Sequence, residues 1–437
     1  MTIDARWPVS DTRTAEQLAH DREDVGRQVA VLASAQQDIV ERIRVRRRSS
    51  GDPFVVVTTD DHRTALTAEN QLVVEADAEQ QGRLGTLLPN WDPDDRPGRS
   101  DRRRTRVLRC RTNRTARELR ADAERLRGHG ITAAVNLLVP LGYVIKGKSY
   151  PGVTVAPGPY SPNGAHAPVR VAVVDTGLTD QGRSDAWDTG LVRNGTDELD
   201  VVAPKDRIDW FAGHGTFAAG IVRQIAPDCE VVVYRFTGPD GLGSDEAAAD
   251  MLIQAADDAA GQRLVINASF GAPAVDGVPP LAMREAVEYI HATYPKVLIV
   301  ASAGNDGADL PLYPAAYPGV KAVGALNADL SPAVFSNRGS WVHCSTVGVG
   351  VVSTFVQGLL PPEEGVGADI PFGSDSWATW SGTSFSAPQI SGAVAALCGE
   401  DAALTPRTAF EQLIGPRPAL AGLGKVVHLL PGTPISC

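Results

Sequence analysis

Three residues with complementary acid–base chemistry lie in separate glycine-rich turns of the sequence. Asp175 follows the apolar run VRVAVV, His214 lies in GHGTFAAG, and Ser384 lies in WSGTSFSAPQISGAVAAL. Each residue alone fits a structural role, because aspartates close turns and serines cap helices. Together, a hydroxyl, an imidazole and a carboxylate form a nucleophile, its general base and the group that orients the base. Their chain order and shared glycine-rich settings favour a catalytic set over three independent caps.

A fourth candidate is Asn305, which follows an apolar run in VLIVASAGNDG. The chain order Asp, His, Ser is that of subtilisin. With the motifs DTG, HGT, AGN and GTSxSxP all present, residues 169–400 resemble the subtilisin-like serine peptidase (subtilase) family. The resemblance implies a serine endopeptidase that acts through an acyl-enzyme on Ser384, with the Asn305 amide and the Ser384 backbone N–H binding the oxyanion.

The same resemblance implies where a protein or peptide substrate binds. In the family, an extended substrate pairs with a strand and inserts a side chain between two walls. Here the walls correspond to Ser269, Phe270 and Gly271 on one side and Ala301, Ser302, Ala303 and Gly304 on the other. Leu312 falls at the base of this first pocket, where its bulk is expected to favour small or medium substrate side chains.

The elements that must position these residues alternate between strand and helix. Continuous apolar runs, typical of parallel strands covered on both faces, occur at residues 169–174, 230–236, 264–266, 297–301 and 322–325. A helix capped by Ser244 lies between two of them. The alternation predicts an α/β fold with a doubly wound parallel sheet, preceded by a smaller α+β N-terminal domain.

Composition shifts divide the chain into three parts. We expect an N-terminal helical and α+β region at 1–148, a linker rich in proline and glycine at 149–168, and a peptidase domain at 169–437. In the N-terminal region, apolar residues at heptad spacing predict a helix within 11–48, which either packs on its own domain or binds a partner. Further elements are expected as follows: strands at 54–59, 71–75 and 104–110, a loop at 89–99, a helix at 115–127 and an apolar run at 131–144.

The role of the N-terminal region stays open at this point. It is expected to be propeptide-like or regulatory, with the linker lying in the active cleft and self-cleavage between residues 145 and 170. An alternative is an interaction protein that keeps the fold and binds a partner through residues 11–48, with proteolysis secondary.

Charge divides the chain in the same way. The net charge is −11, yet residues 1–165 carry more basic than acidic side chains and residues 166–437 the reverse. This asymmetry favours docking of the N-terminal region on its acidic neighbour over nucleic-acid binding, since no aromatic residues interleave the arginines.

Other classes of site and location are disfavoured. The five cysteines are scattered and expected to be reduced, and neither a signal peptide nor an apolar run long enough to span a membrane is visible. A cytoplasmic location follows as the default, with secretion by a non-standard route left open. No cofactor is expected. The helix after His214 lacks the inserted calcium loop of many secreted relatives, although calcium and the acidic residues Asp306 and Asp309 are left open.

Overall fold

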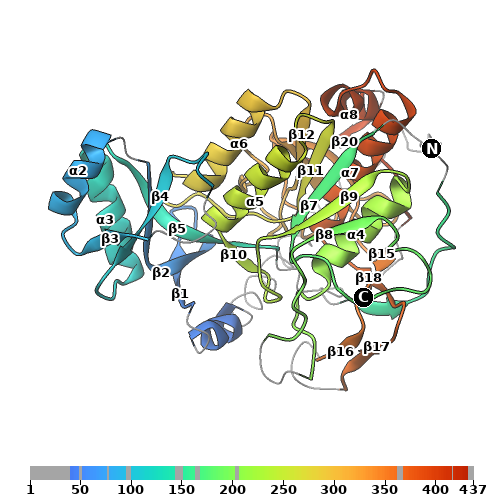
Figure 1. Ribbon diagram of the computed structural model, residues 1–437, viewed down its shortest axis with the longest axis horizontal. Coiled ribbons are helices and arrows are strands. Elements are labelled where there is room, and N and C mark those ends of the chain that lie inside the picture. The colour runs from blue at the N-terminus through green and yellow to red at the C-terminus, as the bar shows by residue number, and fades with distance from the viewer. Residues whose placement is uncertain are drawn as a thin grey trace, which may run out of the picture.

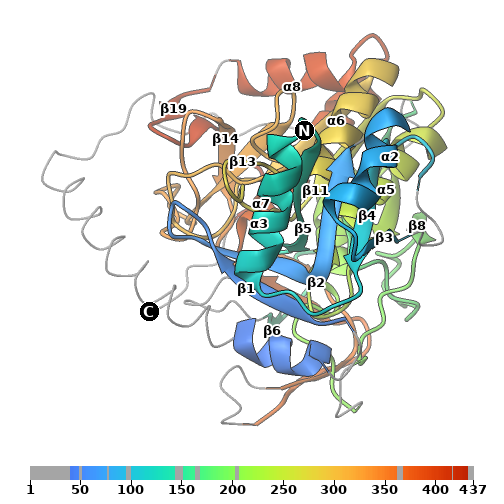
Figure 2. The same cartoon turned by 90° about the vertical axis from the view of Figure 1, so that its left-hand side faces the viewer.

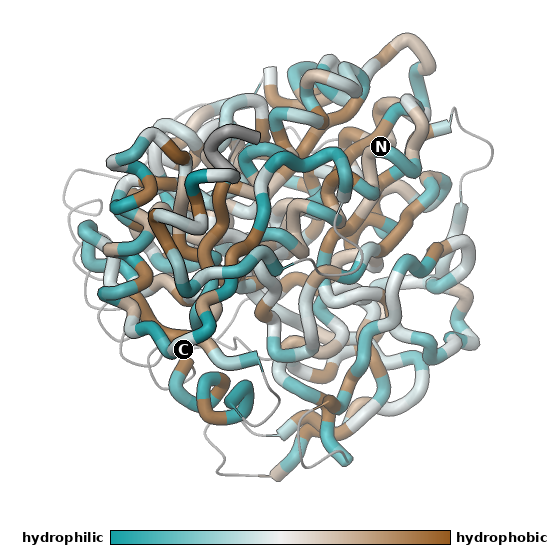
Figure 3. The backbone as a smooth tube through the Cα atoms, turned by 60° about the vertical axis from the view of Figure 1, so that its left-hand side comes forward, coloured by the Kyte–Doolittle hydropathy of each residue, from teal (hydrophilic) through white to brown (hydrophobic). Residues whose placement is uncertain are grey.

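The computed structural model describes residues 40–48, 52–75, 78–94, 100–142, 151–162, 168–201, 206–361, 368–415 and 417–431. Residues 168–431 form a larger unit around a mainly parallel sheet, and residues 40–142 form a smaller N-terminal unit beside it (Figure 1). Apolar segments run through the interior of both units, and hydrophilic segments lie mostly outside (Figure 3). Among the described helices, none is long and apolar enough to cross a membrane.

The sheet of the larger unit confirms the predicted doubly wound fold. Within the described residues it has nine strands in the order β19-β20-β14-β13-β12-β11-β7-β9-β8, parallel except for β19 against β20. The strands are β7 (Arg170–Asp175), β8 (Leu191–Asn194), β9 (Glu230–Arg235), β11 (Leu264–Ala268), β12 (Val297–Ser302), β13 (Lys321–Leu326), β14 (Val342–Val347), β19 (Ala419–Leu420) and β20 (Gly424–Val426). All five apolar runs named from the sequence are strands of this sheet.

Helices cover both faces of this sheet, which explains why its strands are apolar throughout. The helices α4 (His214–Ile225), α7 (Thr383–Glu400) and α8 (Pro406–Ile414) pack on one face, and α5 (Asp245–Asp258) and α6 (Leu281–Thr293) pack on the other (Figure 1). Alternate residues of one strand enter opposite cores, since side chains point to opposite faces with period two. In β7, Val171 and Val173 lie in the α4/α7 core, and Ala172 and Val174 lie in the α5/α6 core.

The N-terminal unit is an antiparallel sheet with helices beside it (Figure 2). Its elements are β1 (Phe54–Thr58), β2 (Thr64–Glu75), α2 (Ala78–Leu87), β3 (Trp91–Pro93), β4 (Thr105–Cys110), α3 (Ala116–Gly128) and β5 (Thr132–Pro140). The predicted 89–99 loop therefore contains a short strand, β3. A strand of the larger unit, β10 (Leu242–Ser244), pairs antiparallel with β5 and completes the sheet. One sheet therefore spans both units.

Arginines of the N-terminal unit meet acidic side chains of the larger unit. Arg103, whose side chain is fully buried, contacts Asp250 at 2.7 Å and Glu246 at 3.4 Å, both on α5. The backbone N–H groups of Arg104 and Thr105 donate to Glu285 of α6 at 2.5 and 2.9 Å. These contacts agree with the docking interpretation of the charge asymmetry.

The expected helix at 11–48 lies largely outside the described residues, but residues 40–48 are helical. Val40 and Ile43 are buried in a cluster with residues of both units. Arg47 donates to Asp240 at 2.5 and 2.9 Å, and the guanidinium groups of Arg42 and Arg46 lie over the Trp210 ring. This part of the segment packs within the molecule, in line with the first of its two predicted roles.

The segment expected to be a linker contains a strand that pairs with a strand of the larger unit. β6 (Gly152–Thr154) pairs antiparallel with β18 (Trp377–Trp380), which also pairs with β15 (Val351–Thr354). A further hairpin is made of β16 (Gly358–Leu360) and β17 (Ile370–Phe372). Tyr160, in the same segment, also contacts the larger unit. Its ring centroid lies 5.4 Å from that of Trp187, and its hydroxyl donates to the Pro227 carbonyl.

Candidate active site

The four residues expected to carry chemistry gather at one edge of the parallel sheet. Asp175 ends β7, Asn305 follows β12, and His214 and Ser384 lie in the first turns of α4 and α7. Strands that run in parallel have their carboxyl ends at the same edge, which is where open α/β sheets place their sites. All four side chains are buried, with exposed fractions of 5% or less.

Asp175 and His214 form a close pair. Nδ1 of the imidazole lies 2.8 and 2.9 Å from the two carboxylate oxygens of Asp175. The backbone N–H of Thr176 also donates to this carboxylate at 2.8 Å. A carboxylate at Nδ1 holds the proton on that nitrogen, so Nε2 is left as the basic one.

Aromatic rings surround this imidazole. The ring centroids of Phe385, Trp380 and Phe211 lie 5.0, 5.3 and 6.2 Å from that of His214. They keep water away from the His214–Asp175 pair, which strengthens the attraction between the two side chains.

A proline inside α7 explains how the nucleophile turn is held. Pro388 has no N–H, so the carbonyl of Ser384, four residues earlier, lacks its helical donor. The Ser269 hydroxyl donates to this carbonyl instead, at 2.9 Å. Asn267 donates to the Ser269 oxygen at 2.9 Å, so the end of β11 and the start of α7 are joined by side chains.

The Ser384 hydroxyl is bonded to backbone carbonyls. Its Oγ lies 2.9 Å from the Leu141 oxygen and 3.2 Å from the Ser269 oxygen. Within the described residues, no hydrogen bond joins it to His214. Leu141 belongs to the N-terminal unit and directly follows β5, so that unit reaches the candidate nucleophile.

Asn305 presents its amide nitrogen to the same place. Its Oδ1 accepts from the backbone N–H and the hydroxyl of Thr383, at 2.9 and 2.8 Å. This fixes the side-chain orientation and directs Nδ2 toward Gly142, where an added methyl group would lie only 2.6 Å from it. Thr383 is a positioning residue that the sequence reasoning missed, although it lies within the GTS motif.

The N-terminal unit runs through the cleft as an extended chain. Pro140 accepts from the backbone N–H of Gly271 at 3.1 Å, and Leu141 donates to the carbonyl of Gly241 at 3.0 Å. Residues 138–141 thus lie between the 241–244 segment and the 269–271 segment. Nothing in the sequence marked Leu141 or Gly142, because their importance depends on how the two units dock.

The predicted pocket walls lie on both sides of Leu312. Gly271 and Gly304 each contact its side chain closely. Phe270 turns the other way, with its ring centroid 4.4 Å from that of Phe236. The remaining wall residues are buried where β12 ends: Ala301, Ser302 and Ala303.

Asp197 is a second buried carboxyl near the site that the sequence reasoning missed. It accepts from the Thr176 hydroxyl at 2.7 Å and from the Gly213 N–H at 2.8 Å. The Thr176 oxygen in turn accepts from the Gly215 N–H at 3.1 Å. Asp197 therefore ties the turn after Asp175 to the start of α4. Burial raises its pKa to about 7 despite these donors.

Metal ligands are not grouped in the part of the chain that can be described. Among those residues, no cluster of three or more histidines, cysteines, aspartates or glutamates could hold an ion. One acidic candidate, Asp306, accepts from the Asn337 side chain at 3.3 Å.

Comparisons with known proteins agree on one family. Residues 167–415 match the family described as "Subtilase family". The chain is 32% identical over 240 residues to the "Thermophilic serine proteinase" of Bacillus sp. (strain AK1), covering 53% of this chain and 52% of that protein. It is 29% identical over 236 residues to "Subtilisin BL" of Lederbergia lenta, covering 52% and 75%. The chain thus spans about half the length of the first of these relatives.

Two further similarities concern an intracellular relative and the fold. The "Intracellular serine protease" of Paenibacillus polymyxa is 32% identical over 243 residues, covering 52% of this chain and 65% of that protein. Among solved structures, fervidolysin from Fervidobacterium pennivorans, described as "a keratinolytic enzyme related to subtilisin", superposes with a TM-score of 0.58 at 20% identity. That similarity covers 83% of this chain and 60% of fervidolysin, and it supports the fold.

Proposed function

Since the chain belongs to the subtilase family, we propose that it is a serine endopeptidase with Ser384 as nucleophile, His214 as general base and Asp175 as the orienting carboxylate. The observation that carries the proposal is the buried pair of Asp175 and His214, at 2.8 and 2.9 Å, beside Ser384 and Asn305. If Asp175 and His214 had only a structural role, the hydroxyl of Ser384 and the amide of Asn305 would not need to lie at the same edge of the sheet.

In the proposed reaction, the Ser384 oxygen attacks the carbonyl carbon of the substrate as Nε2 of His214 takes its proton. The negative charge on the carbonyl oxygen is stabilised by the Asn305 amide and the Ser384 backbone N–H. The C–N bond then breaks and His214 gives its proton to the leaving amine. Water attacks the resulting ester in the same way, which releases the new carboxylate and restores the Ser384 hydroxyl.

These residues supply the nucleophile and the proton transfers themselves. We therefore propose that catalysis needs no cofactor, and that a chelator leaves the chemical step unchanged. The cytoplasmic location stays a prediction, and similarity to the intracellular protease of Paenibacillus polymyxa supports it. Fractionation of cells that express the chain would test it.

We also propose that the N-terminal unit inhibits the enzyme in cis. Residues 138–142 lie in the cleft in the manner of a bound substrate, and the Leu141 carbonyl holds the Ser384 hydroxyl at 2.9 Å. This segment precedes the linker that was expected in the cleft. The proposed bond of self-cleavage accordingly moves to Gly142–Tyr143, just before the 145–170 range.

Active-site labelling tests the catalytic assignment. A fluorophosphonate probe is expected to label wild-type chain at Ser384, and the label should fall to background in the Ser384→Ala and His214→Ala variants. Conversion of the remote His129→Ala, an exposed residue after α3, serves as control and should leave labelling unchanged. Labelling that persists in His214→Ala at the wild-type rate would overturn the assignment.

Self-cleavage tests the inhibitory segment. Mass spectrometry of purified wild-type chain is expected to find a new N-terminus at Tyr143, and none in Ser384→Ala. Dilution should not change the cleavage rate per molecule, because the cut bond lies in the same chain. Cleavage that is equally fast in Ser384→Ala would show that another protease acts on this bond.

A further inference from the structure

The side chain of Leu312 fills the space in which a subtilase would receive a substrate side chain. A methyl group placed on Gly271 would lie 2.5 Å from Cδ2 of Leu312, and one placed on Gly304 would lie 2.8 Å from the same atom. One leucine methyl group therefore packs against the backbone of both walls at once. Leu312 is 8% exposed, so little of its side chain faces solvent. The Leu312 side chain therefore occupies the space between the two walls.

The backbone around Leu312 is fixed. Tyr313 exchanges two hydrogen bonds with Ala272, at 2.8 and 2.9 Å, and these tie the segment to the chain that follows Gly271. The Leu312 carbonyl accepts from the Ala316 N–H at 2.9 Å. Emptying the pocket would require a change of rotamer among close-packed neighbours, since the backbone is held on both sides of the residue.

The segment in the cleft shows which residue lies beside the nucleophile. Val139 pairs with Gly243 and Leu141 bonds to Gly241 on one side, whereas Pro140 bonds to Gly271 on the other. Bonds that alternate between two flanking segments follow the period of an extended chain. The next residue, Gly142, lies beside Asn305 and Ser384.

Gly142 itself has no side chain to place there. Its φ of 104° is a conformation that favours glycine, and a Cβ would lie 2.6 Å from Asn305 Nδ2 and 3.9 Å from Ser384 Oγ. The filled pocket and the glycine beside the nucleophile are separate observations on separate segments. Each of them disfavours a side chain on the substrate residue that is attacked.

We infer that this enzyme cleaves on the carboxyl side of glycine, with Leu312 as the residue that sets the preference. The inference rests on the proposed endopeptidase activity and adds its substrate class: peptides with glycine as the residue that is attacked. In that reaction Ser384 forms an ester with the glycine carbonyl, and water then releases a peptide that ends in glycine.

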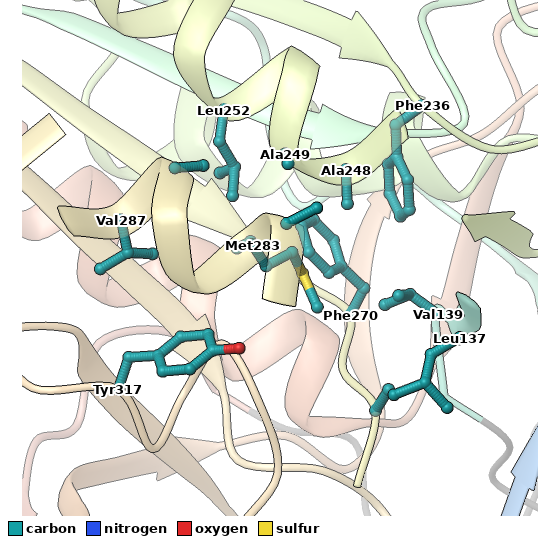
Figure 4. Packing of buried hydrophobic residues seen from close by; sticks show 14 of the residues in the cluster. Leu137, Val139, Phe236, Ala248, Ala249, Leu252, Phe270, Met283, Val287 and Tyr317 are labelled. Atoms are coloured by element: carbon teal, nitrogen blue, oxygen red, sulfur yellow. The ribbon is translucent and has the colours of Figure 1, made fainter. Parts of the chain in front are cut away.

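The positions before the glycine favour apolar residues. Leu141 and Val139 are 1% and 0% exposed, and Val139 lies beside Phe236 and Phe270 in the core (Figure 4). These two side chains indicate that a substrate with apolar residues two and four positions from the cut bond gains burial. The matching peptide is the chain's own sequence Leu-Val-Pro-Leu-Gly-Tyr-Val-Ile.

The test compares this peptide with versions in which glycine is replaced by alanine or phenylalanine. Rates are measured with full-length chain and divided by the fraction of Ser384 that the fluorophosphonate labels. We expect kcat/KM for the glycine peptide to exceed that for the phenylalanine peptide by about 100-fold or more, a difference within reach of a closed pocket. Mass analysis should place the cut after glycine.

Pocket variants show whether Leu312 causes the preference. In Leu312→Ala and Leu312→Gly the ratio of phenylalanine to glycine cleavage should rise by at least about tenfold, whereas Leu312→Ile, of equal volume, and Leu310→Ala, on the same loop, should keep it. If Leu312→Gly does not fold, Leu312→Ala still tests the preference, because it removes less of the packing.

The two proposals fail differently. Labelled enzyme that cuts the phenylalanine peptide as fast as the glycine peptide, or that cuts between Leu and Gly, overturns the glycine preference alone. Chain that neither takes the label nor cuts any of the peptides, even after residues 1–142 have been removed, overturns the proposed activity.

Discussion

Arg103 offers a direct test of how the N-terminal unit is held in the cleft. Its fully buried side chain contacts Asp250 and Glu246 of α5, and its Nη1 donates to Thr105 at 3.0 Å. The change Arg103→Met keeps the aliphatic part of the side chain and removes the guanidinium. Asp250 and Glu246 then lose the guanidinium across the junction, while Asp250 keeps the Ser100 N–H and the local strand β4 keeps its backbone bonds.

The expected cost follows from burial. Removing one partner of a buried, hydrogen-bonded ion pair costs about 3–5 kcal/mol, mostly because the remaining charge stays buried without its counterion. If this cost falls on the docked state, the fraction of molecules with an open cleft rises by about 100- to 4,000-fold, at about 1.4 kcal/mol per factor of ten. The exposed Arg109, 48% exposed and paired with Asp94 inside the N-terminal unit, is the matched control.

The assay is the rate at which the fluorophosphonate labels Ser384 in uncleaved chain. A probe reaches the hydroxyl only when Leu141 has left it, so the rate reports the open fraction. We expect labelling to be faster by at least about two orders of magnitude in Arg103→Met and to change less than about fivefold in Arg109→Met, since an exposed pair is worth about 0–1 kcal/mol. Equal rates in Arg103→Met and wild type, with both folded by circular dichroism, would refute the claim that α5 docking closes the cleft.

Three further changes test individual contacts. Asp197→Asn should flatten the pH dependence of stability: the folded-state pKa of about 7 lies above the unfolded value of 3.8, so wild type loses stability as pH rises from about 4 to 7, by at most about 4 kcal/mol. Ser269→Ala should cost about 1–3 kcal/mol in urea unfolding, because the Ser384 carbonyl loses its donor. Adding Pro388→Ala, which supplies a helical N–H to that carbonyl, should recover part of this loss. Asn305→Ala should lower kcat by about 10²–10³ in steady-state assays, a magnitude taken from the corresponding donor of a subtilisin.

Each of these has an outcome that contradicts it. Unfolding free energies of Asp197→Asn that fall with pH as steeply as in wild type would assign the pH dependence to other groups. If the losses of unfolding free energy from Ser269→Ala and Pro388→Ala simply add in the double variant, the Ser269 hydroxyl does not replace the helical donor that Pro388 lacks. An unchanged kcat in Asn305→Ala, with KM alone raised, would make that amide a ground-state contact.

Local patterns in the sequence were sufficient to predict the strands that bring Asp175 and Asn305 to one edge of the sheet. The strand that ends at Asp175 and the strand that precedes Asn305 are apolar runs covered by helices on both faces, a signal that depends on the strand itself. The cap at Ser244 was predicted as well, and its hydroxyl accepts from Ala247 at 3.1 Å. Such features require no knowledge of distant residues.

Features that depend on docking could not be predicted. The bond between Leu141 and Ser384 joins residues 243 positions apart, and no periodicity marks it. The linker prediction missed β6 because a three-residue edge strand among prolines and glycines has too few side chains for a pattern. Thr383 and Asp197 act through hydrogen bonds with neighbours that only folding brings together.

The edge of β10 pairs with β5 of the same chain, and the Gly271 N–H donates to Pro140. In the proposed reaction, a substrate would need the same edge and the same N–H. A tethered segment competes at an effective concentration in the order of millimolar, far above that of most free peptides. Raising the amount of substrate would therefore do little to displace β5. Control over the proposed endopeptidase should instead come from whatever cuts the tether or unfolds the N-terminal unit. Its activity would then depend on that event more than on the concentration of substrate.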